Sequence, residues 1–197
     1  MGRRQAAVDK TRGRILAAAR RLLLARRPEA FSLDAVARRV GVARMTVYHQ
    51  FGSRRALLEA LFDDLARAGG MHELPDAFRQ PDPEEALARF VATFGRFWTS
   101  ARLLHRRLQA LGVLDVELGR ALRDRREWAR QGLRVIAGRF ARPGGGRPAD
   151  DVVDALFALT SFHTFDTLAG ATRTPAQVTP LVLRLARSAL GPALVSS

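Results

Sequence analysis

The sequence contains no cysteine among its 197 residues. Disulfide bonds, thiolate metal sites and cysteine nucleophiles are therefore excluded. Hydrophobic runs are also short, because none approaches the roughly 18 apolar residues that a membrane-spanning helix needs. The basic N-terminus has no apolar stretch that would make it a signal peptide. These absences predict a soluble, cytoplasmic protein with no membrane partner.

Sequence signatures of common enzymes are missing as well. The chain has no G-x-S-x-G, no H-E-x-x-H and no G-x-x-x-x-G-K segment. The glycines at 144–146 lack the Lys and Ser or Thr of a phosphate-binding loop, so they indicate a flexible loop. Ser161, His163 and Asp166 lie too close together on one expected helix for a conventional catalytic triad. We therefore expect no enzyme activity, no cofactor and no metal site.

Acidic residues are scarce at one end of the chain. Residues 1–55 hold 14 Lys and Arg side chains but three acids, whereas residues 56–197 hold 19 basic and 16 acidic side chains. A basic N-terminal part on a nearly balanced body suggests a polyanionic partner for that part. The alternative is that arginine, which supplies 32 of the 33 basic residues, serves as a general solvated residue.

Patterns of strand type are absent, and almost every segment has the periodicity of a helix. The first expected helix is capped by Asp9 or Thr11 and ends near Leu24. The next runs from the Ser32 cap to Val40, and a short one follows Gly41 and ends near Phe51. The other expected helices are 53–69, 83–100, 101–111, 115–140, 150–168 and 175–190. Residues 69–83 are turn-rich and polar, which predicts a domain boundary there.

The two helices that flank Gly41 have the spacing of a helix-turn-helix, whose second helix lies in the major groove of DNA. In that second helix, Val47 and Phe51 are four residues apart and can anchor it on a small core. A different face carries the polar candidates for DNA contact: Arg44, Met45, Thr46, Tyr48 and His49. An ordinary helical hairpin with a polar outer face is the alternative interpretation.

The side chains on this outer face have the chemistry that DNA requires. Arg44 can donate two hydrogen bonds to a guanine, and Met45 can contact a thymine methyl group. Thr46, Tyr48 and His49 carry hydroxyl or ring N–H donors that suit phosphate oxygens. The pattern therefore predicts double-stranded DNA as the partner of the N-terminal part.

Four segments between about Thr11 and Leu61 resemble the DNA-binding domain of the tetracycline-repressor (TetR) family of bacterial regulators. They are ILAAARRLLL, FSLDAVARRVGV, MTVYHQF and SRRALLEA, in this order and spacing. The resemblance implies an all-α protein with a three-helix helix-turn-helix domain at 1–55, a connecting helix at 56–69, and a ligand-binding and dimerisation domain at 70–197. It further implies a homodimer, a palindromic operator and a small-molecule effector.

The resemblance also assigns residues that hold the DNA backbone: Thr46, Tyr48, His49, Ser53 and Arg54. Arg54 replaces the usual Lys, but its charge serves phosphate equally well. Ala43 replaces the usual Ser or Thr cap of the recognition helix. Arg3 and Arg4 precede the first helix, either as a disordered tail or as an arm in the minor groove.

We expect a ligand-responsive one-component transcriptional regulator, a repressor that a small apolar or amphipathic effector releases from its operator. A transcriptional activator stays open as an alternative. A non-specific architectural DNA-binding protein is a further alternative, although it would need basic residues along the whole chain.

The C-terminal part carries aromatic residues spaced along one helix face, including Phe94 and Trp98. Such a stripe is usually core, but the resemblance favours the wall of an effector pocket. The predicted ligand contacts are Phe94, Trp98, His105, Leu108, Trp128, Phe157, His163 and Asp166. The alternative for each histidine is a structural role in the core.

The segment 152–170 is apolar almost all round, so one chain is not expected to bury it completely. Together with 175–190 it predicts a four-helix bundle across a two-fold axis. The candidate interface residues are Leu156, Phe162, Leu181 and Leu185. A purely intramolecular bundle is the alternative.

Overall fold

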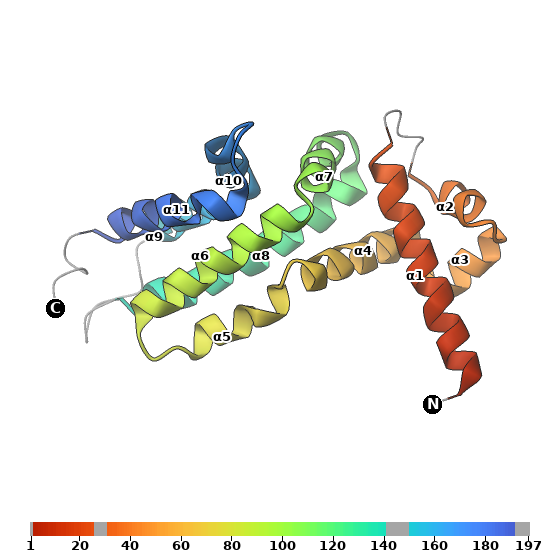
Figure 1. The fold of residues 1–197 in the computed structure, drawn as a ribbon, viewed down its shortest axis with the longest axis horizontal. Coiled ribbons are helices and arrows are strands. Elements are labelled where there is room, and N and C mark those ends of the chain that lie inside the picture. Colours follow the sequence, from red (N-terminus) through yellow and green to blue (C-terminus); the bar gives the residue numbers. More distant parts are fainter. Residues whose placement is uncertain (1, 26–30, 141–149, 192–197) are drawn as a thin grey trace. The chain divides into compact units, whose positions relative to one another are not determined.

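The computed structural model describes residues 2–25, 31–140 and 150–191, and every regular element within these ranges is a helix (Figure 1). The elements are α1 (Arg3–Leu23), α2 (Leu33–Val40), α3 (Arg44–Phe51), α4 (Arg54–Ala68), the 3₁₀ turn η1 (Met71–Glu73), α5 (Leu74–Arg79), α6 (Pro83–Ser100), α7 (Arg102–Leu114), α8 (Val116–Gly138), α9 (Asp150–Leu159), α10 (Phe162–Ala169) and α11 (Pro175–Leu190). The predicted all-α fold class is confirmed. Among the described residues, no helix combines the length and apolarity needed to cross a membrane.

The chain divides into two compact units that interleave along the sequence. Residues 1–65 and 103–122 form one unit, which we call the head unit. Residues 66–102 and 123–197 form the other, which we call the body unit. The domains expected from the sequence are consecutive, whereas α7 and the first turns of α8 belong to the head unit. The division of functions between those domains stays a prediction.

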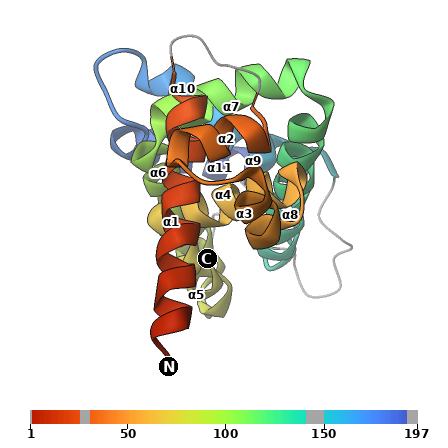
Figure 2. The same cartoon turned by 90° about the vertical axis from the view of Figure 1, so that its right-hand side faces the viewer.

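The head unit has a core made by its first helices. Helix α2 packs against both α1 and α3, as Figure 2 shows from the side of these helices. Ile15, Val36 and Val47 contribute one fully buried side chain from each of the three helices, and Leu57 of α4 joins them. This small core fixes the orientation of α3.

Helix α1 begins at Arg3, seven residues before the start that a cap at Asp9 would give. Asp9 and Thr11 lie inside the helix and do not cap it. The Asp9 carboxylate accepts a hydrogen bond from the Gln5 side chain at 3.0 Å, one turn away. The Thr11 hydroxyl donates to the Ala7 carbonyl at 3.0 Å. Both polar side chains thus find partners along the helix, and the helix extends through them.

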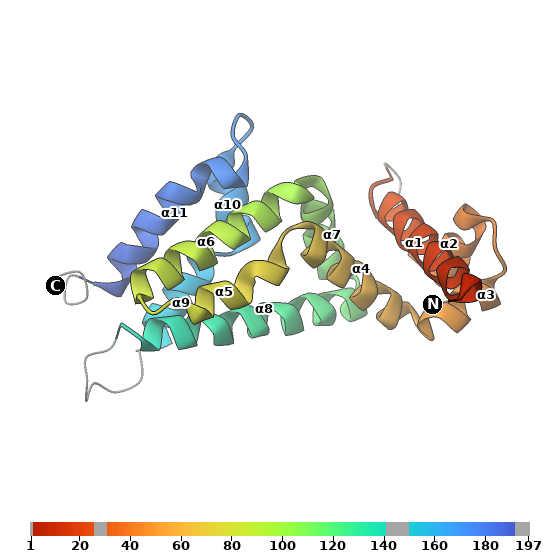
Figure 3. The ribbon, with the colours of Figure 1, turned by 60° about the horizontal axis from the view of Figure 1, so that its bottom comes forward.

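The body unit is organised around α6, which packs against α5, α10 and α11 (Figure 3). Phe90 of α6 and Phe165 of α10 are fully buried in its core. Leu133 of α8, Val153 of α9 and Val182 of α11 belong to the same core. With Leu74 and Ala77 of α5, six described helices of the body unit thus bury apolar side chains in one cluster, and this burial stabilises the unit.

The segment expected as one helix at 150–168 is two helices, α9 and α10. The backbone of Ser161 is extended, and its hydroxyl accepts the N–H of Thr164 as an N-cap. The carbonyl of Thr160 accepts a hydrogen bond from Trp98 Nε1 at 3.1 Å. The expectation of one continuous helix was therefore wrong. The break leaves the Thr160 carbonyl without a helical partner, and the indole N–H of Trp98 on α6 satisfies it.

The turn-rich segment at 69–83 contains η1 and the short helix α5. Pro75 lies in the first turn of α5, where a missing N–H costs nothing. Leu74 and Ala77 are buried in the core of the body unit. Part of the expected boundary is therefore an ordered piece of the body unit.

Candidate nucleic-acid interface

The turn between α2 and α3 depends on Gly41. The Ser32 hydroxyl caps the start of α2 by accepting the N–H of Ala35 at 3.1 Å. At the other end of α2, Gly41 adopts a left-handed conformation with φ of 75°, which favours glycine. Its N–H donates to the Ala37 carbonyl at 3.0 Å and closes the helix. The predicted cap and turn are both confirmed.

Helix α3 buries one of its faces in the head unit. Val47 and Phe51 are buried in the core, as their spacing predicts. The guanidinium of Arg12 lies 4.4 Å from the centroid of the Phe51 ring. The same group donates to the Gln50 carbonyl at 3.1 Å. These contacts tie the end of α3 to α1 and hold the helix at a fixed rotation.

The opposite face of α3 is open to solvent. Met45 and Tyr48 are 54% and 49% exposed, which is unusual for large apolar and aromatic side chains. Arg44 and His49 are exposed beside them, and Thr46 is half-buried. The structure therefore brings the five predicted contacts of α3 together on one helix, with four of them exposed.

The charge of Arg44 is loosely held. Its Nε lies 3.6 Å from Oδ1 of Asp34, and both side chains are largely exposed. Such a surface ion pair contributes about 0–1 kcal/mol, so Arg44 can be redirected to another anion at little cost. Ala43 gives no side-chain cap to α3, as the departure from the family pattern predicts.

The start of α4 carries the other two predicted contacts, Ser53 and Arg54. Ser53 is exposed, and its hydroxyl caps α4 by accepting the N–H of Ala56 at 3.0 Å. Arg54 follows it, but the Arg54 side chain is only 25% exposed. The two neighbours therefore differ in how freely they can meet an external partner.

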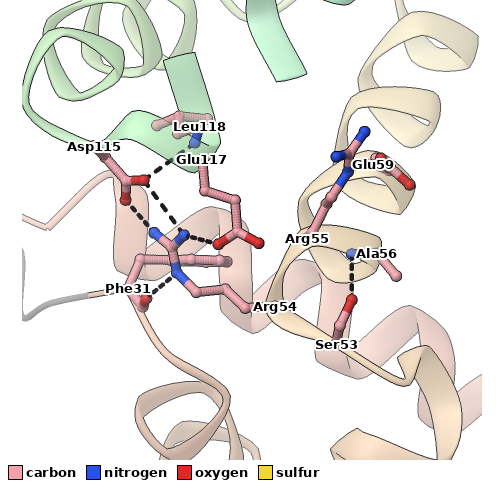
Figure 4. Close-up of polar contacts among 9 residues, drawn as sticks. All are labelled: Phe31, Ser53, Arg54, Arg55, Ala56, Glu59, Asp115, Glu117 and Leu118. Atoms are coloured by element: carbon pink, nitrogen blue, oxygen red, sulfur yellow. Dashed lines mark hydrogen bonds and ion pairs between the residues drawn. The ribbon is translucent and has the colours of Figure 1, made fainter. Parts of the chain in front are cut away.

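The guanidinium of Arg54 is bound by two carboxylates of the α7–α8 corner, as the close-up in Figure 4 shows. Its Nη1 donates to Glu117 Oε2 at 2.5 Å and to Asp115 Oδ1 at 3.4 Å. Its Nη2 donates to the other oxygen of Asp115. Its Nε donates to the Phe31 carbonyl at 2.7 Å. We call these three partners, Phe31, Asp115 and Glu117, the Arg54 clasp.

The ionisation of the clasp follows from its geometry. Burial alone lowers the pKa of Arg54, but the hydrogen bonds and charges of Asp115 and Glu117 outweigh it and raise that pKa. Burial alone raises the pKa of Asp115, but hydrogen bonds from Arg54 and the Leu118 N–H, with the charge of Arg54, hold it below its ordinary value. Both groups are therefore charged at neutral pH.

Sequence reasoning did not find the acids of the clasp. Asp115 is 61 residues from Arg54, and the sequence gives no signal for a contact at that separation. Arg39 is exposed in the last turn of α2. It was not among the predicted DNA contacts, although its charge is evident in the sequence. The side chains of Arg3 and Arg4 lie outside the part of the structure that is described.

The predicted ligand contacts belong to different units. His105 and Leu108 are buried in the head unit, and the other six residues belong to the body unit. Phe94 is buried there, and its ring centroid lies 5.8 Å from that of the half-buried Trp98. Asp166 accepts a hydrogen bond from Arg102 Nε at 2.5 Å. The aromatic stripe on α6 thus forms part of the core of the body unit.

The remaining ligand candidates lie nearer the surface. Trp128 is 59% exposed, and His163 is exposed on α10. Phe157 is half-buried, with the guanidinium carbons of Arg126 and Arg130 at 5.4 and 6.0 Å from its ring centroid. These positions give no single cluster of ligand contacts in the body unit as far as it is described, and the role of each residue stays a prediction.

The candidate interface residues also differ in burial. Leu156 and Phe162 are buried within their own chain, Leu181 is half-buried, and Leu185 is exposed. The first two are covered by helices of the body unit, since α9 and α10 both pack against α11. Of these four candidates, Leu185 is therefore the most exposed in the single chain, and their role at an interface stays a prediction.

The comparison with protein families covers part of the head unit. Residues 15–61 match the family model described as "Bacterial regulatory proteins, tetR family". The match runs from α1 through α2 and α3 into α4, so it includes the buried and the exposed faces of α3. No protein with a curated description matches the chain significantly.

Proposed function

Because the chain belongs, through its N-terminal domain, to the bacterial regulatory proteins of the tetR family, we propose that it is a cytoplasmic repressor that binds a palindromic operator. The observation that carries this proposal is the exposed face of α3, with Met45 and Tyr48 half exposed on a helix whose other face is buried. Exposed apolar and aromatic side chains on a rigid helix are typical of a contact surface.

The proposed roles of the α3 residues follow from their side chains. Arg44 reads a guanine and Met45 contacts a thymine methyl group. Thr46, Tyr48 and His49 donate hydrogen bonds to the phosphate backbone. The exposed hydroxyl of Ser53, at the start of α4, is a further proposed phosphate contact.

The experiment that tests this proposal is the selection of bound sequences from a random duplex library. We expect the wild type to enrich a palindrome. Arg44→Ala is expected to relax the preference at one base position, which costs about 1–3 kcal/mol there, whereas Tyr48→Ala weakens all sequences about equally. Arg89→Ala, an exposed arginine of the body unit that pairs with Glu85, serves as the control. Unchanged affinity in both α3 variants would place α3 outside the groove.

We further propose that the protein acts as a homodimer through the exposed side of α11. Leu181 and Leu185 lie one turn apart there, and Leu185 is 40% exposed. A two-fold dimer places two heads on the two halves of a palindrome. Enrichment of a single asymmetric half-site in the library selection would contradict the dimer while leaving DNA binding in place.

We propose, finally, that a small apolar or amphipathic effector releases the DNA. The support for a site within the body unit is Trp98, which is only half-buried at the edge of the aromatic core residues of α6. Release requires that the effector prefer the form of the protein that does not bind DNA. DNA must then weaken the effector by the same factor, since the coupling between two sites is reciprocal.

A compound that releases DNA is expected to change the fluorescence of Trp98, which lies in the aromatic cluster. DNA should weaken its binding by the same factor, about 5–150-fold for typical coupling. Trp128→Phe leaves Trp98 as the only indole, so the signal can be assigned. A compound that quenches Trp98 without changing DNA affinity would be a ligand of the body unit but not an effector.

A further inference from the structure

The Arg54 clasp occupies every nitrogen of its guanidinium. Asp115 accepts from Nη1 and Nη2, Glu117 accepts from Nη1, and the Phe31 carbonyl accepts from Nε. A guanidinium binds a carboxylate and a phosphate through the same planar pair of N–H groups. A DNA phosphate can therefore take both terminal nitrogens of Arg54 only by displacing Asp115.

One acid of the clasp, Asp115, also has a partner other than Arg54. Oδ1 of Asp115 accepts the N–H of Leu118 at 3.1 Å, so this carboxylate also caps the start of α8. Earlier on α7, Arg107 donates to the carbonyls of Leu23 and Ala25 at and just beyond the end of α1. The cap orients the Asp115 carboxylate, and Arg107 ties α7 to the end of α1 within the head unit.

The two acids of the clasp carry more negative charge than Arg54 can neutralise. Two carboxylates face one guanidinium, and the side chains of Asp115 and Glu117 are 30% and 42% exposed. An excess negative charge beside the start of α4 opposes the approach of the DNA backbone over about 8–10 Å at moderate salt. The resemblance to the tetR family implies that Arg54 contacts that backbone, which would give the same residue two competing anionic partners.

We propose that Asp115 and Glu117 compete with DNA phosphate for Arg54 and thereby set the affinity and the salt dependence of DNA binding. This inference rests on the proposed function, because it requires that the head unit bind DNA. In the clasped state, Arg54 contributes little to DNA binding. When the carboxylates release it, Arg54 adds one phosphate contact.

Four proteins test the competition: the wild type, Asp115→Asn/Glu117→Gln, Arg54→Gln, and the variant that combines all three changes. Their affinity for a mixed-sequence duplex is measured over a range of salt concentrations. In the wild type, Arg54→Gln removes no phosphate contact, so it is expected to weaken binding only by the long-range effect of one lost positive charge. When both acids are already neutralised, the same substitution should weaken binding about tenfold, as expected for a charge-assisted hydrogen bond. The slope of log affinity against log salt should fall in that background by about 0.9, the value for one phosphate contact.

The variants are chosen so that a loss of folding can be recognised. Asparagine caps a helix as well as aspartate does, so Asp115→Asn preserves the start of α8. The single variant Glu117→Gln leaves that cap untouched. In its background, Arg54→Gln should also weaken DNA binding, but by a smaller factor than in Asp115→Asn/Glu117→Gln. Asp63→Asn/Asp64→Asn is the charge control, because it removes two acids from α4 of the same unit.

Two results would overturn the inference. If Asp115→Asn/Glu117→Gln raised affinity equally whether Arg54 was intact or replaced by glutamine, the acids would act by long-range charge alone. If the control Asp63→Asn/Asp64→Asn raised affinity as much, the effect would again be general charge. Absence of DNA binding by every folded variant at low salt would instead overturn the proposed function, and this inference with it.

Discussion

Replacing Phe90 with alanine is expected to lower the free energy of unfolding by about 3–5 kcal/mol. Phe90 is fully buried at the centre of the body unit, and its ring centroid lies 4.8 Å from that of Phe94 and 6.2 Å from that of Phe78. A methyl group added to Gly132 of α8 would lie 2.9 Å from the Phe78 ring and 3.4 Å from the Phe90 ring. Since the helices already approach this closely, we expect them to relax only partially into the space that the lost ring leaves.

Denaturant-induced unfolding of the full chain measures this loss, with Trp128→Ala as the matched control. Trp128 was predicted, like the aromatic stripe of α6, to line a ligand pocket, yet it is 59% exposed. Its removal is expected to change stability by no more than about 0.5 kcal/mol. Similar losses in the two variants would contradict the assignment of Phe90 to the core and of Trp128 to the surface.

Arg102→Ala is expected to have the second-largest effect, a loss of about 2–3 kcal/mol. The Arg102 guanidinium donates to the carboxylate of Asp166 at 2.5 Å and to the carbonyls of Asp166, Gly170 and Arg173 at 3.1, 2.7 and 2.9 Å. These carbonyls lie at and beyond the C-terminal end of α10, where a cation also meets the negative end of the helix dipole. The Arg102 and Asp166 side chains are both mostly buried, so solvent screens their attraction little.

The control for Arg102 is Arg96→Ala. Arg96 pairs with Glu73 at 2.5 Å, but both side chains are about half exposed. Exposed ion pairs contribute about 0–1 kcal/mol, so the shift in the unfolding midpoint should be much smaller. Arg102→Lys keeps the charge without the planar fork and should fall between the two. Equal midpoints for Arg96→Ala and Arg102→Ala would show that the contacts of Arg102 contribute nothing specific.

Local signals predicted the parts of the fold that depend on neighbouring residues. Ser32 and Ser53 cap their helices, and Gly41 closes α2 with a positive φ, because a hydroxyl or a missing Cβ acts within a few residues. The burial of Val47 and Phe51 followed from their spacing on one helix. The outer face of α3 could therefore be described from the sequence before its structure was known.

Contacts between distant segments account for what the sequence did not predict. The break before α10 involves Trp98 of α6, which is 62 residues away from the Thr160 carbonyl that it binds. Arg54 was assigned to phosphate by its place in the motif, but its carboxylate partners come from the α7–α8 corner. Periodicity identifies which side chains face inward, but it does not identify which segment they meet.

Tyr48 is the only tyrosine in the chain, and it lies on the exposed face of α3. Reagents that nitrate or iodinate phenol rings would therefore modify this face of the protein and no other tyrosine. Because the chain has no cysteine, a thiol introduced elsewhere could carry a second label by independent chemistry. The composition thus allows the candidate DNA-binding face to be labelled at Tyr48 without any substitution.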